Sequence, residues 1–559
     1  MKVQVAAIQY EPKFIDKEHN LKQLLSLTEE AAVRGAKLIV LPEMCTTGYY
    51  FDNREQILPL AEEIPNGPST VAFSALSKKY NCYIVVGIAE INGSNLYNSA
   101  FFVGPDAYIG RYRKVQPFPP DNTWAKNGDE AIKVYSTPIG NIAILICMDI
   151  SFPETASVCK SLGADIICVP MNWYEALMPS GIWITRAYEN GVFLIAADRC
   201  GKEKGGVFGG ETSIIGPHGD FLAVKKEGNG IVMSEIEPSQ CRELPLIPRQ
   251  RKMYSFLQCN PYHWPGNLSF KLYRDNRLPE GDTFMAGVAQ FTPGEKENNI
   301  KIIKDLLIEA NGKNLRYLVL PEFALSGIPN SRQEAEEIAL DENDESIGQL
   351  QKLVSENNIH LVCGLVLKQD KQLYNAAIYI PPQGPALFYK KSHLNKQDKL
   401  WATQGTEEPL IINATGARLG IIIGEELNIP ELSRLAANHG ADMIMVPSAM
   451  PKYRAAYKDS PEGENHWHLA RIRANENNTY VLFSNCLKGS GIFGPYMFLK
   501  HRQEVIITDD SLACIRIDTR EIISKNDDFK WEVNKVREKF MLATRQENWY
   551  DAVFEMNPT

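Results

Sequence analysis

A pattern that occurs twice constrains the fold of this 559-residue chain more than any other feature. Four residues of the first half recur in the second half at one constant shift (391 − 114 = 277): Lys114, Asp121, Trp124 and Gly128 correspond to Lys391, Asp398, Trp401 and Gly405. The same shift places Cys147 opposite Gly424 (147 + 277 = 424). One copy therefore keeps a possible nucleophile that the other lacks, and the repeat predicts an active module beside a non-catalytic one.

The length of the chain suits two domains of about 200–270 residues better than one core. Apolar strand-like runs alternate with helix-like patterns and predict an α/β fold in which helices cover the sheets. We expect strands at 3–9, 37–41, 82–88, 98–103, 142–147, 165–169 and 192–197, and helices at 153–162, 180–190 and 298–310. We place a first domain at 1–257, a linker with little periodicity at 258–284 and a second domain at 285–559. Chance similarity between two α/β domains is the alternative, and the matching heads and tails of the two halves disfavour it.

The composition is that of an ordinary globular protein, with 44% hydrophobic and 23% charged residues. The net charge of −9 is modest and predicts no nucleic-acid partner, which usually needs a clustered basic face. The first residues lack the apolar core of a signal peptide, and no apolar run approaches the roughly 18–20 residues of a membrane span. The eleven cysteines include no CxxC pair, so most are expected to be reduced core residues rather than zinc ligands. We therefore expect a cytoplasmic protein without a membrane partner.

Three side chains of the first half have the chemistry of a covalent C–N hydrolysis site. Glu43 and Cys147 each follow an apolar strand-like run, and Lys114 ends the basic stretch Arg111-Tyr-Arg-Lys114. Ligand-facing groups of α/β folds collect at strand ends. There a carboxylate can take the thiol proton, the thiolate can attack a carbonyl carbon, and an ammonium can stabilise the oxyanion. The plainer alternative is that Cys147 is a small buried hydrophobe, as we expect for most of the other cysteines.

The motifs around these residues resemble those of the nitrilase superfamily of carbon–nitrogen hydrolases, over nearly all of residues 1–257 and most of 285–550. They are Leu-Pro-Glu43 with Gly48-Tyr49, Tyr-Arg-Lys114, Ile-Cys147-Met-Asp149 with Phe152-Pro-Glu154, Pro170-Met-Asn172-Trp173, Arg186-Ala-Tyr-Glu189-Asn190 and Ser213-Ile-Ile-Gly-Pro217-His-Gly219. The resemblance implies two tandem αββα sandwich domains, a catalytic triad of Glu43, Lys114 and Cys147, and no metal or organic cofactor. Members often pair through a helical face. The two modules are therefore expected to form an intramolecular pseudo-dimer, which leaves a further homo-oligomer open.

The resemblance also implies roles for residues beside the triad. Asp121 stands seven residues after Lys114, where the family often has a glutamate, and is expected to orient Lys114 or the substrate nitrogen. The backbone N–H of Met148 is expected to help hold the oxyanion. Tyr49, Asn172 and Trp173 are candidate walls of the substrate pocket, with packing in the core as the alternative role.

The residues that follow the nucleophile bear on the substrate. Cys147-Met148-Asp149 is closer to the amidase and carbamoylase branches than to the Cys-Trp-Glu of true nitrilases. Ser151 stands where branches that act on omega-amides tend to place an arginine. We predict an enzyme that hydrolyses a small amide or N-carbamoyl compound through a thioester and releases ammonia or an amine. Nitrile hydrolysis, acyl transfer or amide synthesis on the same triad, and a small-molecule-sensing pseudoenzyme, are the alternatives.

The second module keeps the polar partners but not the nucleophile. It has Glu322, Lys391 and Asp398, whereas Gly424 stands at the cysteine position and no Ser or Thr replaces it. We expect a non-catalytic partner of the first module. The alternative is a ligand pocket in which Glu322 and Lys391 bind a regulator.

Overall fold

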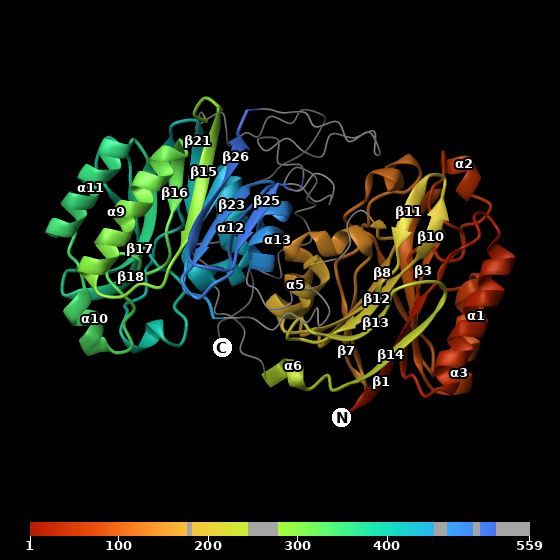
Figure 1. Ribbon diagram of the computed structural model, residues 1–559. Helices are drawn as coiled ribbons and strands as arrows, with labels where there is room; N and C mark the ends of the chain where they lie inside the picture. Colours follow the sequence, from red (N-terminus) through yellow and green to blue (C-terminus); the bar gives the residue numbers. More distant parts are fainter. Residues whose placement is uncertain (176–180, 244–277, 452–466, 496–502, 521–540, 542–559) are drawn as a thin grey trace. The chain divides into compact units, whose positions relative to one another are not determined.

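The computed structural model describes residues 1–175, 181–243, 278–451, 467–495, 503–520 and 541. These residues form two compact units: the first contains residues 1–243, and the second contains the described residues from 278 onward. Most of the expected linker at 258–284 lies outside the described residues, which resume at 278. Each unit is built of sheets and helices from its own part of the sequence, as the colours of Figure 1 show.

Two six-stranded sheets form the centre of the first unit. Across the first sheet the strands are β14 (Gly230–Ile236), β1 (Val3–Gln9), β2 (Leu38–Val40), β3 (Tyr83–Asn92), β4 (Asn95–Val103) and β5 (Tyr108–Arg113). Across the second they are β13 (Phe221–Lys225), β12 (Thr212–Ile215), β9 (Phe193–Asp198), β8 (Ile166–Met171), β7 (Gly140–Ile144) and β6 (Val134–Thr137). β1–β2–β3 and β7–β8–β9 are parallel, so the functional loops after these strands share one edge of each sheet.

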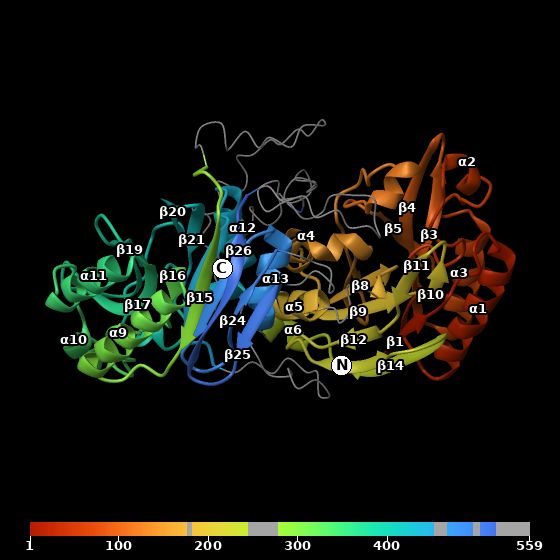
Figure 2. The same cartoon turned by 45° about the horizontal axis from the view of Figure 1, so that its top comes forward.

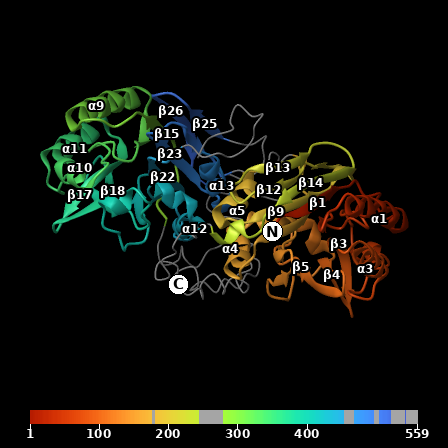
Figure 3. The same ribbon diagram turned by 90° about the horizontal axis from the view of Figure 1, so that it is seen from below.

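Helices cover the outer faces of both sheets in the first unit. α1 (Lys17–Val33) and α3 (Pro68–Tyr80) pack on the first sheet, and α5 (Gly181–Asn190) packs on β9 and β12 with α4 (Pro153–Ser161) beside it (Figure 3). The remaining elements are the short helices α2 (Arg54–Ile57) and α6 (Gln240–Glu243), the hairpin β10 (Cys200–Glu203) and β11 (Gly206–Gly209), and 3-10 turns at Pro119–Thr123 and Cys147–Ser151. Two sheets face to face between two helical layers make an αββα sandwich.

The second unit repeats this architecture (Figure 2). Across its first sheet the strands are β19 (Leu387–Lys390), β18 (Gln372–Ile380), β17 (His360–Gln369), β16 (Leu315–Val319), β15 (Thr283–Gln290) and β26 (Ser511–Asp518). Across its second sheet they are β20 (Leu410–Ala414), β21 (Ala417–Ile421), β22 (Met443–Ser448), β23 (Tyr480–Asn485), β24 (Ser490–Phe493) and β25 (Glu504–Ile507). Its helices are α9 (Lys296–Gly312), α10 (Arg332–Ile338), α11 (Glu345–Asn357), α12 (Pro430–Asn438) and α13 (Trp467–Asn477), with 3-10 turns at Asp398–Leu400 and Gly424–Asn428. The two units also share a helix C-cap: α3 and α11 are followed by Asn81 and Asn358, which obey the shift of the repeat (358 − 81 = 277). Both asparagines have the left-handed backbone conformation that commonly ends a helix.

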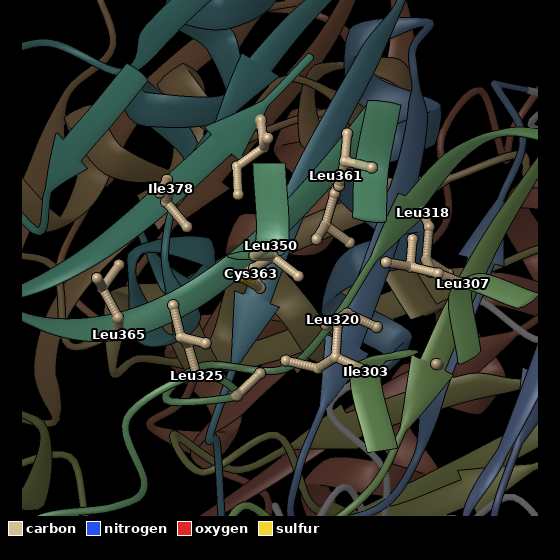
Figure 4. Close-up of a cluster of buried hydrophobic side chains, with 14 of the residues drawn as sticks. Ile303, Leu307, Leu318, Leu320, Leu325, Leu350, Leu361, Cys363, Leu365 and Ile378 are labelled. Atoms are coloured by element: carbon tan, nitrogen blue, oxygen red, sulfur yellow. The ribbon is translucent and has the colours of Figure 1, made fainter. Parts of the chain in front are cut away.

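A cluster of aliphatic side chains joins α9 and α11 to the first sheet of the second unit (Figure 4). Ile303 and Leu307 lie one turn apart on α9 and therefore share the face that is buried against the sheet. Leu350 of α11 and Leu361 of β17 belong to the same buried cluster. Burial of each such side chain stabilises the fold by about 1.5–3 kcal/mol. This apolar layer provides the rigid sheet whose strand ends carry the polar residues of the second module.

The α/β prediction and the tandem αββα sandwich are confirmed, and most expected elements lie within three residues of the observed ones. The strand expected at 142–147 is wrong at its end, because β7 stops at Ile144 and Cys147 starts a 3-10 turn. The hairpin β10–β11 was not expected at all. No helix in the described part of the chain is long and apolar enough to cross a membrane.

Candidate active site

A sharp turn at the end of β7 presents Cys147. Its φ of +44° is in the left-handed region, which non-glycine residues adopt rarely and mostly where the surrounding structure enforces it. Asp149 enforces it here: its Oδ2 accepts hydrogen bonds from Ile146 N and Tyr112 Oη, each at 2.9 Å, and its Oδ1 accepts one from Gln116 N at 2.7 Å. Burial raises the pKa of the Asp149 carboxyl to about 7, against the effect of these donors. The Asp149 carboxylate, two residues after the thiol, therefore holds the turn in its left-handed conformation.

Glu43 and Lys114 meet in a fully buried polar network. Lys114 Nζ lies 2.7 Å from Glu43 Oε1 and 2.8 Å from Asp121 Oδ2. Asn98, on β4, donates from Nδ2 to Glu43 Oε1 at 2.7 Å and to Asp121 Oδ1 at 3.1 Å. Every member is at least 97% buried. Two carboxylates and one ammonium thus share a buried site, and the network leaves Glu43 Oε2 buried with no hydrogen-bond partner among the described residues.

The charges of this network act on one another and on the Cys147 thiol. Burial raises the pKa of the Glu43 carboxyl, Lys114 opposes the rise, and Asp121 adds to it. Burial acts to lower the pKa of Lys114, but Asp121 and Glu43 outweigh it and keep the ammonium protonated. For Cys147, burial first and then Glu43 raise the pKa well above its usual value, while Lys114 and a hydrogen bond from the Asn172 backbone act against them. The raised pKa favours the neutral thiol of Cys147, which would need a base in order to react. Glu43 acts on this thiol electrostatically, and its Oε2 is buried without a hydrogen-bond partner among the described residues.

The expected pocket walls differ in what they face. Tyr49 lies beside the network, with its ring centroid 5.8 Å from Lys114 Nζ. Both polar atoms of the Asn172 side chain are buried without a partner among the described residues, as is the Tyr49 hydroxyl. Trp173 packs edge-on against Trp183, with 5.7 Å between ring centroids, so its ring is part of an aromatic layer.

Met148 follows Cys147 within the same 3-10 turn and is buried. Its backbone amide therefore lies directly after the thiol, which is where an oxyanion donor would be needed. In the described residues, no three His, Cys, Asp or Glu side chains cluster as metal ligands would.

The second module has the same polar network, and its glutamate occupies the space that the thiol has in the first module. Lys391 Nζ lies 3.0 Å from Glu322 Oε1 and 2.7 Å from Asp398 Oδ2. Glu322 Oε2, however, accepts a hydrogen bond from Ala449 N at 2.8 Å. Ala449 occupies the position of Asn172 in the repeat (449 − 172 = 277). The backbone amide at this position hydrogen-bonds the Cys147 sulfur in the first module and the Glu322 carboxylate in the second. A Cβ atom built on Gly424 would come within 2.4 Å of that same Glu322 oxygen. The carboxylate therefore occupies the space of the missing side chain.

Each network contains an asparagine that the sequence patterns did not predict. Asn98 bridges Glu43 and Asp121, and Asn375 makes the same two contacts with Glu322 and Asp398, at 2.6 and 2.8 Å. The signal was present, because the two asparagines obey the shift of the repeat (375 − 98 = 277) in Leu-Tyr-Asn.

The glycine at position 87 was also missed. A Cβ there would lie 2.6 Å from Glu43 Cα, so only glycine lets β3 approach the backbone of the glutamate this closely.

Comparisons with known proteins identify the family of the chain. The family model described as carbon–nitrogen hydrolase matches residues 4–246 and again residues 285–512. The chain belongs to the carbon–nitrogen hydrolase family. The match on both halves confirms the tandem duplication, and family membership confirms the expected enzyme class.

Individual relatives of this carbon–nitrogen hydrolase match about one module. A nitrilase of Pyrococcus abyssi is 37% identical over 225 residues, which are 40% of this chain and 86% of the relative. The chloroplastic omega-amidase of Arabidopsis thaliana is 30% identical over 259 residues, 42% of this chain and 69% of the relative. Among solved structures, an amidase from Nesterenkonia sp. is similar at 23% identity with a TM-score of 0.41, over 46% of this chain and 96% of that one.

Proposed function

We propose that the first module hydrolyses the C–N bond of a small amide or N-carbamoyl compound through a thioester on Cys147. The observation that supports this most is the unsatisfied carboxylate oxygen of the buried Glu43–Lys114–Asp121 network, Glu43 Oε2, because Glu43 is also the charged group that raises the pKa of the Cys147 thiol most. A neutral thiol needs a base, and a buried glutamate whose pKa is raised is better suited to both take and return a proton than an exposed one. The relatives include both omega-amidases and nitrilases, so the preference for an amide over a nitrile rests on the sequence Cys147-Met148-Asp149.

The proposed reaction proceeds in two halves. Glu43 takes the Cys147 proton while the sulfur bonds to the carbonyl carbon, and the oxyanion that forms is held by Lys114 and the Met148 amide. Glu43 then gives its proton to the departing nitrogen as the C–N bond breaks, leaving the thioester. In the second half Glu43 takes a proton from water, the hydroxide bonds to the acyl carbon, and the C–S bond breaks. The thiolate regains its proton from Glu43, which restores the starting state.

Lys114 acts as a fixed positive charge throughout this cycle. Because Asp121 and Glu43 raise its pKa, it does not release its own proton to the substrate. One oxyanion donor of this kind typically contributes about 10²–10³ in rate. Asp121 and Asn98 hold Lys114 and Glu43 in register rather than react themselves.

We propose that the second module is non-catalytic. It has no thiol at position 424, and Glu322 is bound on both oxygens, by Lys391, Asn375 and the Ala449 amide. A carboxylate so bound is not available to serve as a base or to take up a ligand. This favours the structural role over the regulator pocket.

The test is turnover of an amide panel by the full chain and by Cys147→Ala. The proposal predicts that ammonia or amine release by the wild-type protein disappears in the variant while its melting temperature is retained. Wild-type release by Cys147→Ala would refute it. A parallel assay with hydroxylamine distinguishes hydrolysis from acyl transfer, because transfer would divert the acyl group to a hydroxamate.

A further inference from the structure

The two modules differ in the connection that follows the central strand of the second sheet. In the first module, residues 199–211 join β9 to β12 (211 − 199 + 1 = 13) and contain the β10–β11 hairpin. In the second module, residues 486–489 join β23 to β24 (489 − 486 + 1 = 4). The module that keeps the thiol is thus also the one with the hairpin.

One end of the hairpin holds the loop that follows Glu43. Glu203, the last residue of β10, accepts hydrogen bonds through Oε1 from the backbone N–H of Tyr49 at 2.8 Å and of Tyr50 at 2.6 Å. Its Oε2 pairs with Arg199 Nη1 at 3.0 Å, and both side chains are buried. Charge-assisted bonds of this kind are short and strong. Since Tyr49 lies beside Lys114, Glu203 fixes the backbone of the loop that borders the network.

The other end of the hairpin holds the segment that serves the thiol. Gly209 N donates to Trp173 O at 2.9 Å, and Phe208 forms an antiparallel bridge with Tyr174. The rings of Phe208 and Tyr174 stack with 5.1 Å between centroids. Trp173 and Tyr174 come directly after Asn172, whose backbone hydrogen-bonds the Cys147 sulfur. The Arg199 guanidinium lies 4.0 Å from the Phe208 ring centroid and so links the two ends.

We propose that the β10–β11 hairpin sets the distance between the base and the nucleophile, and that Glu203 is the positioning residue through which it acts. The inference rests on the proposed roles of Glu43 and Cys147. Glu203 touches neither of them; it fixes the loop after one, while Phe208 and Gly209 fix the segment that binds the other. The second module, which has no thiol to position, has no such hairpin among its described residues.

Two substitutions separate positioning from simple stability. Glu203→Asp keeps the charge beside Arg199 but is one methylene shorter, so it withdraws from the Tyr49 and Tyr50 amides. It is expected to keep the fold and to lower both kcat and the rate of Cys147 alkylation by iodoacetamide at least about tenfold, since small misplacements of reacting groups can cost ~10²-fold. Glu203→Gln keeps the acceptor but leaves Arg199 without a counter-charge. It should lower the melting temperature of the first module by roughly 6–20 °C, while the rate per folded molecule falls less than about threefold.

Lys202→Ala is the matched control, because Lys202 lies on the same strand and its side chain is exposed. Alkylation is read at the Cys147 peptide by mass spectrometry of the full chain. If Glu203→Asp is folded and matches Lys202→Ala in kcat and alkylation rate, the inference is overturned while the proposed function stands. If wild-type Cys147 is not alkylated at all, the proposed function itself fails.

A second variant decides the matter should Glu203→Asp not fold. In Gly206→Ala the added Cβ would lie 2.6 Å from a ring carbon of Tyr50, which must move away from the hairpin. The inference expects slower alkylation of Cys147 in this variant, again at least about tenfold. A wild-type alkylation rate would overturn it.

Discussion

Gly424→Ala probes why the second module has no nucleophile. Gly424 has a φ of +50°, where a residue with a Cβ costs about 1–2 kcal/mol. The new Cβ would also lie 2.4 Å from Glu322 Oε2, well inside contact distance. To make room, Glu322 must release the Ala449 amide, a bond to a charged group worth about 1.5–3 kcal/mol. Together these effects destabilise the second module by about 2.5–5 kcal/mol.

The cost is measured as hydrogen exchange of the β21 and β22 amides in the full chain, since a two-module chain has no single unfolding free energy. Exchange of the most protected amides should accelerate by about two to four orders of magnitude, at 1.4 kcal/mol per tenfold. Cys147→Ala is the matched control, read at the β7 and β8 amides of the first module. Its Cβ is already accommodated at a φ of +44°, so it should cost about 1 kcal/mol or less. Amide turnover by Gly424→Ala should stay at the wild-type level.

The origin of the cost is resolved by a double-mutant cycle. With Glu322→Ala in the background, Gly424→Ala meets no carboxylate and should cost only the about 1–2 kcal/mol of its backbone conformation. The difference between the two backgrounds, about 1.5–3 kcal/mol, is the coupling between the residues. An equal cost in both backgrounds would refute the idea that the carboxylate fills the place of the thiol.

The repeat provides controls for the remaining predictions. Asn98→Leu removes the donor shared by Glu43 and Asp121 and should lower kcat roughly tenfold or more, whereas Asn375→Leu should leave turnover unchanged; equal turnover in both variants would contradict the role of Asn98. Because Glu43 must be ionised to accept a proton, activity is lost as pH falls through its pKa, which burial and then Asp121 raise. Asp121→Asn should therefore move the acid limb of kcat/KM to lower pH, and Asp398→Asn should not; an unmoved or upward-shifted limb in Asp121→Asn would contradict the assignment of Glu43 as the base.

Much of the fold follows from the sequence because the duplicated pattern and the strand–helix alternation are both local signals. α5 was expected at 180–190 and lies at Gly181–Asn190, and β1 was expected and lies at 3–9. The end of β7 was not predictable in this way. An apolar run shows where a strand can continue, whereas the left-handed turn at Cys147 is imposed by donors to Asp149 from other parts of the chain.

The site could be predicted only as far as its residue types reveal their partners. Glu43 and Lys114 lie together because they follow β2 and β5, and Asp121 joins them from the 3-10 turn Pro119–Thr123. Glu203 could not be anticipated, since its partners are backbone amides 153 and 154 residues away. The position of Glu322 beside Gly424 could not be anticipated either. A glycine at the cysteine position does not reveal which neighbouring side chain fills the space.

In the proposed reaction one thiol per chain, that of Cys147 in the first module, forms a bond to the substrate. Intact mass spectrometry of the full chain, quenched during turnover of an amide panel and followed by peptide mapping, tests it directly. We expect a single acyl adduct, on the peptide that contains Cys147, and none in Cys147→Ala. An adduct on any other residue would contradict this assignment. So would turnover that proceeds without an adduct and persists in Cys147→Ala.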